Sequence, residues 1–343
     1  MSGDGHRILT PDELGALALA SVGGAAAGPF DEQPYLVVRV TPAAPEAERG
    51  RLAAWLARQP CPVIGLLDGD RRDEPPVADA LVDACDVLVS STAELDELAA
   101  NIRAAPIAAM TLVQVLRATQ GMPAAQALVV ESLAYATLQA GPEFAAWSKA
   151  NPPRPEPAPV EDGPPVLLAR DGARLDITLN RPRSRNPISV EMRDALVEAL
   201  QFAATDDSLR EVHLSGAGAC FSSGGDLREF GTAPDPASAH AVRSLRLPAA
   251  ELIRCASRVT AHLHSACIGS GIELPAFAAH IRAARNTFIQ LPELRFGLIP
   301  GAGGCVSLPR RIGRQRTAWL VLSGRRINAA TALAWRLVDE IVD

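Results

Sequence analysis

The sequence predicts an α/β protein, because apolar segments rich in β-branched residues alternate with segments of helical pattern. In the first third of the chain the strand-like segments are 35–40 (YLVVRV), 62–67 (PVIGLL) and 86–90 (DVLVS). Helical segments at 47–58 and 77–85 separate them, and this alternation implies βα units. Hydrophobic residues make up 48% of the chain, which is enough for a well-buried core.

Composition excludes several classes of function. The net charge of −6 gives a nucleic-acid surface no electrostatic support. The six cysteines are scattered without metal-ligand spacing, so we expect no metal site and reduced core thiols in a cytoplasmic protein. The apolar stretch 14–28 is too short to span a bilayer and lacks a basic start, so we expect neither a signal nor a membrane anchor.

The N-terminal half carries a helix start, a helical region and a linker. Thr10, Pro11, Asp12 and Glu13 read as an N-cap followed by a proline and acids in a first turn. Residues 93–150 are helical in pattern. Residues 151–165 (NPPRPEPAPVEDGPP) form a proline-rich, semi-rigid linker and the best domain boundary.

After the linker the pattern returns to strands and helices. We expect a hairpin around Asp171-Gly172, because alternating segments flank this turn. Ser189 is placed to cap a helix over 189–203, since Met192 and Leu196 share one face. The other expected elements are a strand at 211–214 and helices at 236–255, 272–281, 314–322 and 329–335.

Two carboxylates near a glycine turn are the chemical feature of the second half. Gly269-Ser270-Gly271 predicts a tight turn that approaches a ligand closely, because glycine permits unusual φ values. Glu273 follows at once, and Glu293 lies twenty residues further on. Two carboxylates beside a turn with free amides suit proton transfer next to a carbonyl group. The alternative is a buried helix with one solvated glutamate at each end.

Four stretches in order carry a resemblance to a known family. They are ITLNRPRSRNPIS (177–189), GAGACFSSGGDLREF (216–230), GSGIE (269–273) and LPELRFGLIPGAGG (291–304). At these spacings they resemble the crotonase (enoyl-CoA hydratase/isomerase) superfamily over residues 165–343. The resemblance implies a crotonase-like spiral of ββα units.

The resemblance assigns expected roles to the motifs. The backbone N–H groups of Gly225 and Ser270 would form the oxyanion hole for a thioester oxygen, although Ser270 stands where the family mostly has glycine. Glu273 and Glu293 match the family's two acid/base carboxylates. Having both favours a hydratase over an isomerase, which generally needs only the carboxylate at the Glu293 position.

Coenzyme A is expected in the substrate, with no separate cofactor and no metal. The resemblance places Ile188, Ser223, Asp226, Leu227 and Gly269 along the channel for the CoA moiety. Pro187 removes one N–H donor there. Arg183 and Arg185 are candidates for the CoA phosphates by charge-assisted bonds, and ordinary solvated arginines are an equal alternative. The segment from Ile299 to Gly304 is expected to shape the pocket.

An internal similarity suggests how the whole chain is organised. Segments 51–69 and 249–265 share a helix, a break, an apolar strand and a turn. We infer that 30–92 is a reduced second copy of the crotonase core, with Arg71 to Pro76 in place of the GSG turn. Residues 93–150 resemble the family's helical tail, which would serve the second core in cis or in trans. The predicted regions are 1–150, 151–165 (linker) and 166–343 (catalytic core).

Enoyl-CoA hydration is the first expectation, in a homo-oligomer such as a trimer or hexamer without nucleic-acid or membrane partners. A second is another crotonase reaction, namely isomerisation, thioester hydrolysis or biosynthetic dehydration. The unusual His264, Ser265, Ser270 and Pro187 motivate it, although a packed, hydrogen-bonded His264 is favoured over a catalytic one. A third is a non-catalytic partner subunit, motivated by the reduced first copy.

Overall fold

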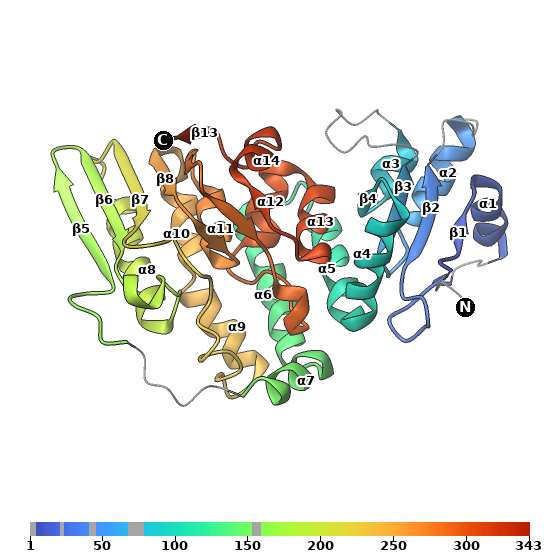
Figure 1. Cartoon of the computed structure of the whole chain (residues 1–343), viewed down its shortest axis with the longest axis horizontal. Coiled ribbons are helices and arrows are strands. Elements are labelled where there is room, and N and C mark those ends of the chain that lie inside the picture. Colours follow the sequence, from blue (N-terminus) through green and yellow to red (C-terminus); the bar gives the residue numbers. More distant parts are fainter. Residues whose placement is uncertain (1–4, 21–23, 41–45, 68–78, 153–158) are drawn as a thin grey trace.

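The computed structural model describes residues 5–20, 24–40, 46–67, 79–152 and 159–343. Three regions follow one another across the molecule: an N-terminal βα unit, a group of four helices, and the large C-terminal region (Figure 1). The α/β class predicted from the alternation of strands and helices is confirmed.

The N-terminal unit is built on a parallel sheet of four strands in sequence order. The strands are β1 (Ile8–Leu9), β2 (Leu36–Val40), β3 (Val63–Leu67) and β4 (Val87–Val89), and the helices are α1 (Pro11–Ala20), α2 (Glu46–Leu56) and α3 (Ala80–Ala84). The predicted cap of α1 is confirmed, because Thr10 Oγ1 accepts from the Glu13 N–H and the Glu13 carboxylate accepts from the Thr10 N–H. The segment 71–76 lies outside the described residues.

Four helices follow, as predicted for 93–150. They are α4 (Thr92–Ala104), α5 (Pro106–Ala118), α6 (Ala124–Gln139) and α7 (Pro142–Ala150). Within the part of the chain that the structure describes, no single helix has the length and apolarity to cross a membrane. Only α4 and α5 taken together, bent by 105°, meet that criterion by length and composition.

The C-terminal region contains a six-stranded sheet in the order β13-β10-β8-β7-β6-β5. Its strands are β5 (Val166–Asp171), β6 (Arg174–Leu179), β7 (Glu211–Gly216), β8 (Val259–Leu263), β10 (His280–Ala284) and β13 (Glu340–Val342). Only the β5–β6 hairpin, turning at the predicted Asp171-Gly172, is antiparallel. Ser189 caps α8 (Val190–Thr205) as expected, since its hydroxyl accepts from the Met192 N–H.

A second, smaller sheet leads into the site. It consists of β9 (Ala266–Ile268), β11 (Phe288–Gln290) and β12 (Ile327–Asn328). β9 and β11 are parallel neighbours, so their carboxyl ends lie side by side. The short 3₁₀ helix η4 (Glu293–Phe296) follows β11, and the helices α12 (Gly304–Ile312), α13 (Arg314–Ser323) and α14 (Ala329–Ala334) complete the region.

Two of the predicted helices are wrong in extent. The run 272–281 is not one helix: α11 (Ser270–Glu273) is a single turn, a 3₁₀ turn spans Pro275–Phe277, and His280 already begins β10. Pro275 has no N–H to continue an α-helix, and β10 fills the place between β8 and β13. The run 236–255 divides into α9 (Pro236–Leu245) and α10 (Pro248–Cys255), because Pro248 holds Leu247 in an extended conformation.

The helices α4–α7 pack on the C-terminal region of their own chain. Trp319 Nε1 of α13 donates to Glu94 at 2.7 Å, and the Asn101 amide donates to the carbonyl groups of Leu322 and Ser323. Asp86, beside β4, is fully buried and bonds both Arg117 of α5 and Arg314 of α13. The six cysteines are free and buried, as expected. The helices α4–α7 therefore pack on the C-terminal region in cis, within the same chain.

Candidate active site

Glu273 and Glu293 approach each other because each follows one of two adjacent parallel strands. The Gly269 N–H donates to the Gln290 carbonyl oxygen at 2.9 Å, which joins the end of β9 to the end of β11. A Cβ built on Gly269 would lie 2.7 Å from Glu293 Oε1 and 3.9 Å from Glu273 Oε1. Both carboxylates thus face this turn, and their oxygens lie no further apart than the sum of the two distances.

Gly269 is required by its conformation as well as by this crowding. Its φ of +51° and ψ of −122° are values that glycine adopts and other residues avoid. Because Gly269 takes the unusual φ, Ser270 is not among the residues with positive φ and begins α11 in an ordinary helical conformation. The conflict between a serine side chain and the geometry of this turn is thereby removed.

Glu273 is held by the turn that precedes α12. Its side chain is 3% exposed, and Oε2 accepts from the N–H groups of Ala302 at 2.7 Å and Gly304 at 2.9 Å. Burial raises the pKa of Glu273 to about 7, and these amides oppose the rise by favouring the ionised form. The segment 299–304, expected only to shape the pocket, therefore also anchors a carboxylate.

Glu293 is buried without such support. It is 7% exposed, and its Oε2 atom has no hydrogen-bond partner among the residues that the structure describes. Burial, followed by the nearby charge of Glu273, raises the pKa of Glu293 well above its ordinary value. Ser270 Oγ is a second buried polar atom without a partner in the described part of the chain. Unpaired buried polar atoms are costly, and these two, one on the turn at Ser270 and one on η4 beside Gly269, mark a place where a polar ligand fits.

The two predicted oxyanion donors lie on loops that pack together. A Cβ on Gly224 would come within 2.7 Å of the Ile268 carbonyl oxygen, and one on Gly271 within 2.8 Å of the Ser222 carbonyl oxygen. Across the described ranges, the backbone N–H groups of Gly225 and Ser270 donate to no protein acceptor. Both amides are therefore available beside the carboxylates.

The residues predicted for the CoA channel lie on one pair of loops. Ile188 forms an isolated bridge with Gly225, and its N–H donates to Gly224. The Ser223 N–H donates to the Arg185 carbonyl oxygen. Asp226 forms an ion pair with Arg228, and the side chain of Leu227 is exposed. A second isolated bridge, between Ser222 and Cys267, joins the loop that carries Gly225 to β9. Arg183 bonds the carbonyl group of Val160 in the linker.

Asn186 is the anchor of these loops. It is fully buried, and its Nδ2 donates to the carbonyl oxygens of Ala217, Cys220 and Phe221, while Oδ1 accepts from the Arg181 N–H. Its φ of +50° suits asparagine better than most residues. The packed reading of His264 is confirmed, since its Nε2 bonds the Gly218 carbonyl oxygen at 3.0 Å.

Sequence reasoning missed a contribution from α6. Glu131 is 1% exposed and accepts from the N–H groups of Gly303 at 2.7 Å and Cys305 at 2.8 Å. One helical turn later, the Tyr135 ring lies against Gly301. The available signal was a lone carboxylate in the otherwise uncharged helix of 124–139, because a buried charge needs partners.

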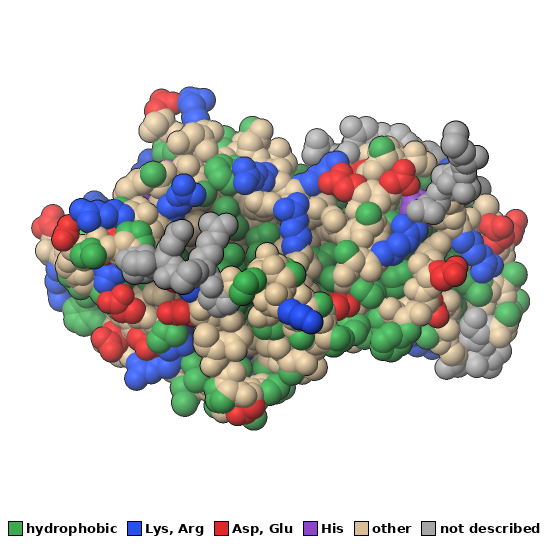
Figure 2. Space-filling model, turned by 60° about the horizontal axis from the view of Figure 1, so that its bottom comes forward, with side chains coloured by type: hydrophobic (Ala, Val, Ile, Leu, Met, Phe, Trp, Pro, Cys, Tyr) green, Lys and Arg blue, Asp and Glu red, His purple; other side chains and the backbone are tan. Residues whose placement is uncertain are grey.

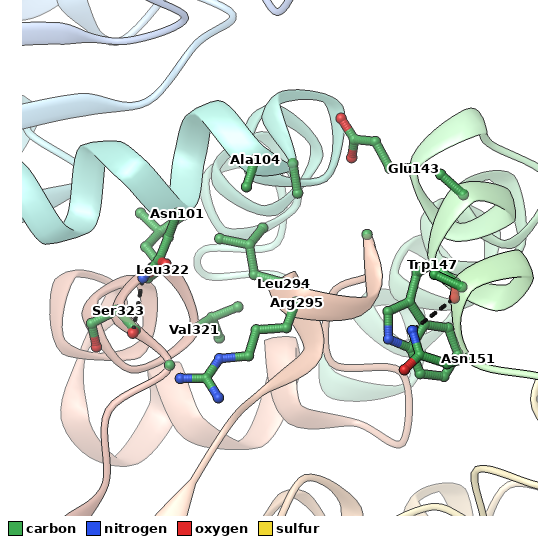
Figure 3. A pocket seen from close by; sticks show the side chains of 15 residues that line it. Asn101, Ala104, Glu143, Trp147, Asn151, Leu294, Arg295, Val321, Leu322 and Ser323 are labelled. Carbon is green, nitrogen blue, oxygen red and sulfur yellow. Dashed lines mark hydrogen bonds between the residues drawn. The ribbon is translucent and has the colours of Figure 1, made fainter.

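A separate cavity of about 270 Å³ lies behind η4 (Figure 3). Asn101 of α4 lies on one side of it, Trp147 of α7 on the other, and Arg295 of η4 between them. None of the predicted site residues lines this cavity. It is therefore distinct from the place where the carboxylates meet.

The surface and the side-chain clusters bear on other classes of ligand. On the face drawn in Figure 2, acidic and basic side chains are interspersed rather than gathered into one patch. Among the described residues, no cluster of three or more His, Cys, Asp or Glu side chains is placed to hold a metal ion.

Comparisons with known proteins identify the family. Residues 171–343, about half of the chain, match the family model described as enoyl-CoA hydratase/isomerase. The 2,3-dehydroadipyl-CoA hydratase of Escherichia coli is 31% identical over 51% of this chain and 68% of its own length, and the carnitinyl-CoA dehydratase of Salmonella paratyphi A is 32% identical over 51% and 67%.

Among solved structures, an enoyl-CoA hydratase from Thermoplasma volcanium is 36% identical. The match covers 53% of this chain and 73% of that one, with a TM-score of 0.48. The predicted resemblance and the crotonase-like fold class are confirmed by the family match, while the matched part spans about two thirds of the curated relatives. This chain belongs to the enoyl-CoA hydratase/isomerase family.

Proposed function

We propose that the chain is an enoyl-CoA hydratase, which adds water across the 2,3 double bond of an enoyl-CoA thioester. The observation that carries the proposal is the pair of buried carboxylates, Glu273 and Glu293, facing Gly269. Relatives acting on dehydroadipyl-CoA and carnitinyl-CoA support a water addition or removal on a CoA thioester. The reaction needs no cofactor beyond the coenzyme A of the substrate, bound along Ile188, Ser223, Asp226, Leu227 and Gly269.

The environments of the two glutamates suggest how they divide the work. Glu273 accepts two amide hydrogens, which favour its ionised form, so it suits the base that takes a proton from water. Glu293 has an unpartnered oxygen and a strongly raised pKa, so it suits the acid. Water oxygen bonds to C3, Glu273 receives the water proton, and Glu293 delivers its proton to C2. Proton exchange with solvent then restores both groups.

The amides of Gly225 and Ser270 would hold the thioester oxygen while it carries negative charge. Fixed backbone donors suit this task, and losing one typically costs about 10²–10³ in rate. In the same proposal the protein acts in the cytoplasm as a homo-oligomer, the residues 166–343 form the catalytic region, and 30–92 is a reduced copy without its own site.

The test is hydration of short and medium 2-enoyl-CoA substrates, followed by the loss of absorbance of the conjugated thioester. Glu293→Gln is expected to remove most of the activity, with the exposed Glu198→Gln as a matched control that keeps it. Absence of turnover at every chain length, with the wild-type protein folded, would contradict the proposal.

A biosynthetic dehydration is the second candidate, because Ser270 places a buried, unpartnered hydroxyl group at the oxyanion turn where it can bond a substrate hydroxyl. Faster elimination of water from a hydroxylated acyl-CoA than addition to any enoyl-CoA, together with loss of that preference in Ser270→Gly, would select it. If calorimetry detects no binding of any CoA ester, both enzymatic candidates fail, and a non-catalytic partner subunit is the hypothesis that remains.

A further inference from the structure

Glu131 and Glu273 accept hydrogen bonds from alternate backbone N–H groups of one short segment, residues 302–305. Glu273 Oε2 accepts hydrogen bonds from the N–H groups of Ala302 and Gly304. The two oxygens of Glu131 accept from the N–H groups of Gly303 and Cys305. These amides precede or begin α12, where backbone donors have no partner within the helix. Two carboxylates from different parts of the chain therefore satisfy all four donors.

Helix α6 also restricts this turn, residues 301–305, by steric contact. A Cβ on Gly301 would come within 2.2 Å of Tyr135 Cδ2, so the ring already fills the space over this glycine. On the other side, a Cβ on Gly304 would come within 2.6 Å of Glu273 Cγ. The turn 301–305 is thus confined between α6 and the side chain of Glu273.

We propose that Glu131 is a positioning residue of the active site, holding the turn 301–305 so that the amides of Ala302 and Gly304 stay aimed at Glu273. The inference rests on the proposed function for the reaction that this turn serves. It assigns a role in the site to the helices at 92–150, which lie outside the region that matches the family model.

The charges around Glu131 couple it to Glu273. Burial, followed by the charge of Glu273, raises the pKa of Glu131 well above its ordinary value, whereas the Gly303 and Cys305 amides and Arg243 lower it. Arg243 of α9 lies over the Tyr135 ring, with its Cζ 4.1 Å from the centroid, and bonds Gln139. The other titratable groups facing this place are Glu293 of η4, Cys305 of α12 and His240 of α9, which bonds Ser132.

This arrangement has a consequence for catalysis. When Glu273 takes a proton, its hold on Ala302 and Gly304 weakens, because a neutral carboxyl group is a poorer acceptor. Glu131 remains on the intervening amides and keeps the turn in place for the next cycle. The amides of Ala302 and Gly304 lower the pKa of Glu273, so a turn that is no longer held by Glu131 should move the titration of Glu273 toward higher pH.

Three variants of the full chain test the proposal. Glu131→Gln keeps the size of the side chain but turns an NH₂ group toward one of the two amides, and Glu131→Asp keeps the charge but loses reach. Glu94→Gln is the control, because Glu94 is also a buried carboxylate that joins these helices to the C-terminal region, through Trp319 of α13.

The kinetic readout is kcat, KM and the pH profile with an enoyl-CoA. We expect kcat to fall about ten- to a hundred-fold in both Glu131 variants, the range expected from a displaced reacting group, with KM changed less. The profile should move to higher pH in both Glu131 variants, because the amides that lower the pKa of Glu273 are displaced, and it should not move in Glu94→Gln. Glu94→Gln should keep the wild-type kcat. An equal loss in Glu94→Gln would reduce Glu131 to a docking contact and overturn the proposal.

A second readout does not depend on turnover. The ¹³C signals of glutamate carboxyl carbons are followed against pH, and Glu273 is identified by its loss in Glu273→Gln. A midpoint for Glu273 that rises in Glu131→Gln supports the proposal, and an unchanged midpoint with unchanged kcat in the folded variant overturns it. If the wild-type chain hydrates no enoyl-CoA, the proposed function fails while this titration still decides the role of Glu131. If Glu131→Gln does not fold, the decision passes to kcat of Glu131→Asp: a loss supports the proposal and a wild-type value overturns it.

Discussion

The ring of Tyr135 lies directly on the backbone of Gly301, so close that a Cβ at this glycine would meet the ring carbon Cδ2 at 2.2 Å. The two residues come from regions separated by the linker and by most of the C-terminal sheet. Their contact means that helix α6 forms one wall of the turn that carries the amides bonded to Glu273. The packing of this turn is therefore not complete within the C-terminal region alone.

Gly301→Ala is expected to push α6 away from this turn. Overpacking of a close contact costs about 1–3 kcal/mol, so the free energy of unfolding should fall by that amount and kcat should fall with it. Urea unfolding and enoyl-CoA kinetics measure the two effects.

Gly50→Ala is the matched control for that change. Gly50 lies in α2, and a Cβ there meets nothing within 4 Å. Alanine should raise the free energy of unfolding by about 0.5–1 kcal/mol, because glycine is a poor helix former. Equal effects of the two substitutions would contradict the crowding at Gly301.

The raised pKa of Glu273 predicts how stability depends on pH. The folded-state pKa of about 7 lies above the ordinary value of 4.5, so the buried acid contributes stability below pH 4.5 that is lost as the pH rises through 7. Glu273→Gln cannot ionise and escapes this loss. Between pH 5 and pH 8 the variant should gain on the wild type by about 1.4 kcal/mol for each pH unit that separates pH 5 from the folded-state pKa.

Urea unfolding at the two pH values measures this difference. Glu198→Gln, at an exposed position of α8, serves as the control and should follow the wild type at both. Wild-type and Glu273→Gln stabilities that change in parallel from pH 5 to pH 8 would show that Glu273 titrates near its ordinary value.

Asp86→Asn tests the attachment of the N-terminal sheet. Asp86 is fully buried between Arg117 and Arg314 and also accepts from the Val63 N–H. Removing one partner of a buried ion pair costs about 3–5 kcal/mol, because the remaining charges stay buried. Guanidinium unfolding should therefore show a large loss, whereas Asp343→Asn, which removes the exposed partner of Arg285, should leave stability unchanged.

Asn186→Asp tests the anchor of the loop that carries Gly225. Aspartate keeps the size of the side chain, but a carboxylate cannot donate to the carbonyl oxygens of Ala217, Cys220 and Phe221. Leaving buried groups unpaired costs about 1–3 kcal/mol, and the displaced loop should raise KM and lower kcat for an enoyl-CoA. An unchanged unfolding midpoint would contradict the role of Asn186 as an anchor.

The sequence by itself determined what depends on near neighbours. The cap at Thr10, the cap at Ser189 and the hairpin at Asp171 are fixed by residues within one turn, so their local pattern predicted them. Glu273 and Glu293 could be named as candidate site residues because each lies in a short motif that also contains the glycine or proline its backbone requires. The expected helix at 236–255 missed the break at Pro248, although proline disfavours a helical conformation at the preceding residue and so carried a local signal for it.

Only the tertiary structure decided what depends on distant partners. The expected helix at 272–281 gave way to a strand, because β10 gains a place between β8 and β13 that no local pattern specifies. Glu131 reached the site because α6 packs on a turn far along the chain, and its burial is tolerated only through the amides of Gly303 and Cys305. A charge is read from the sequence, but the donors that stabilise it come from the fold.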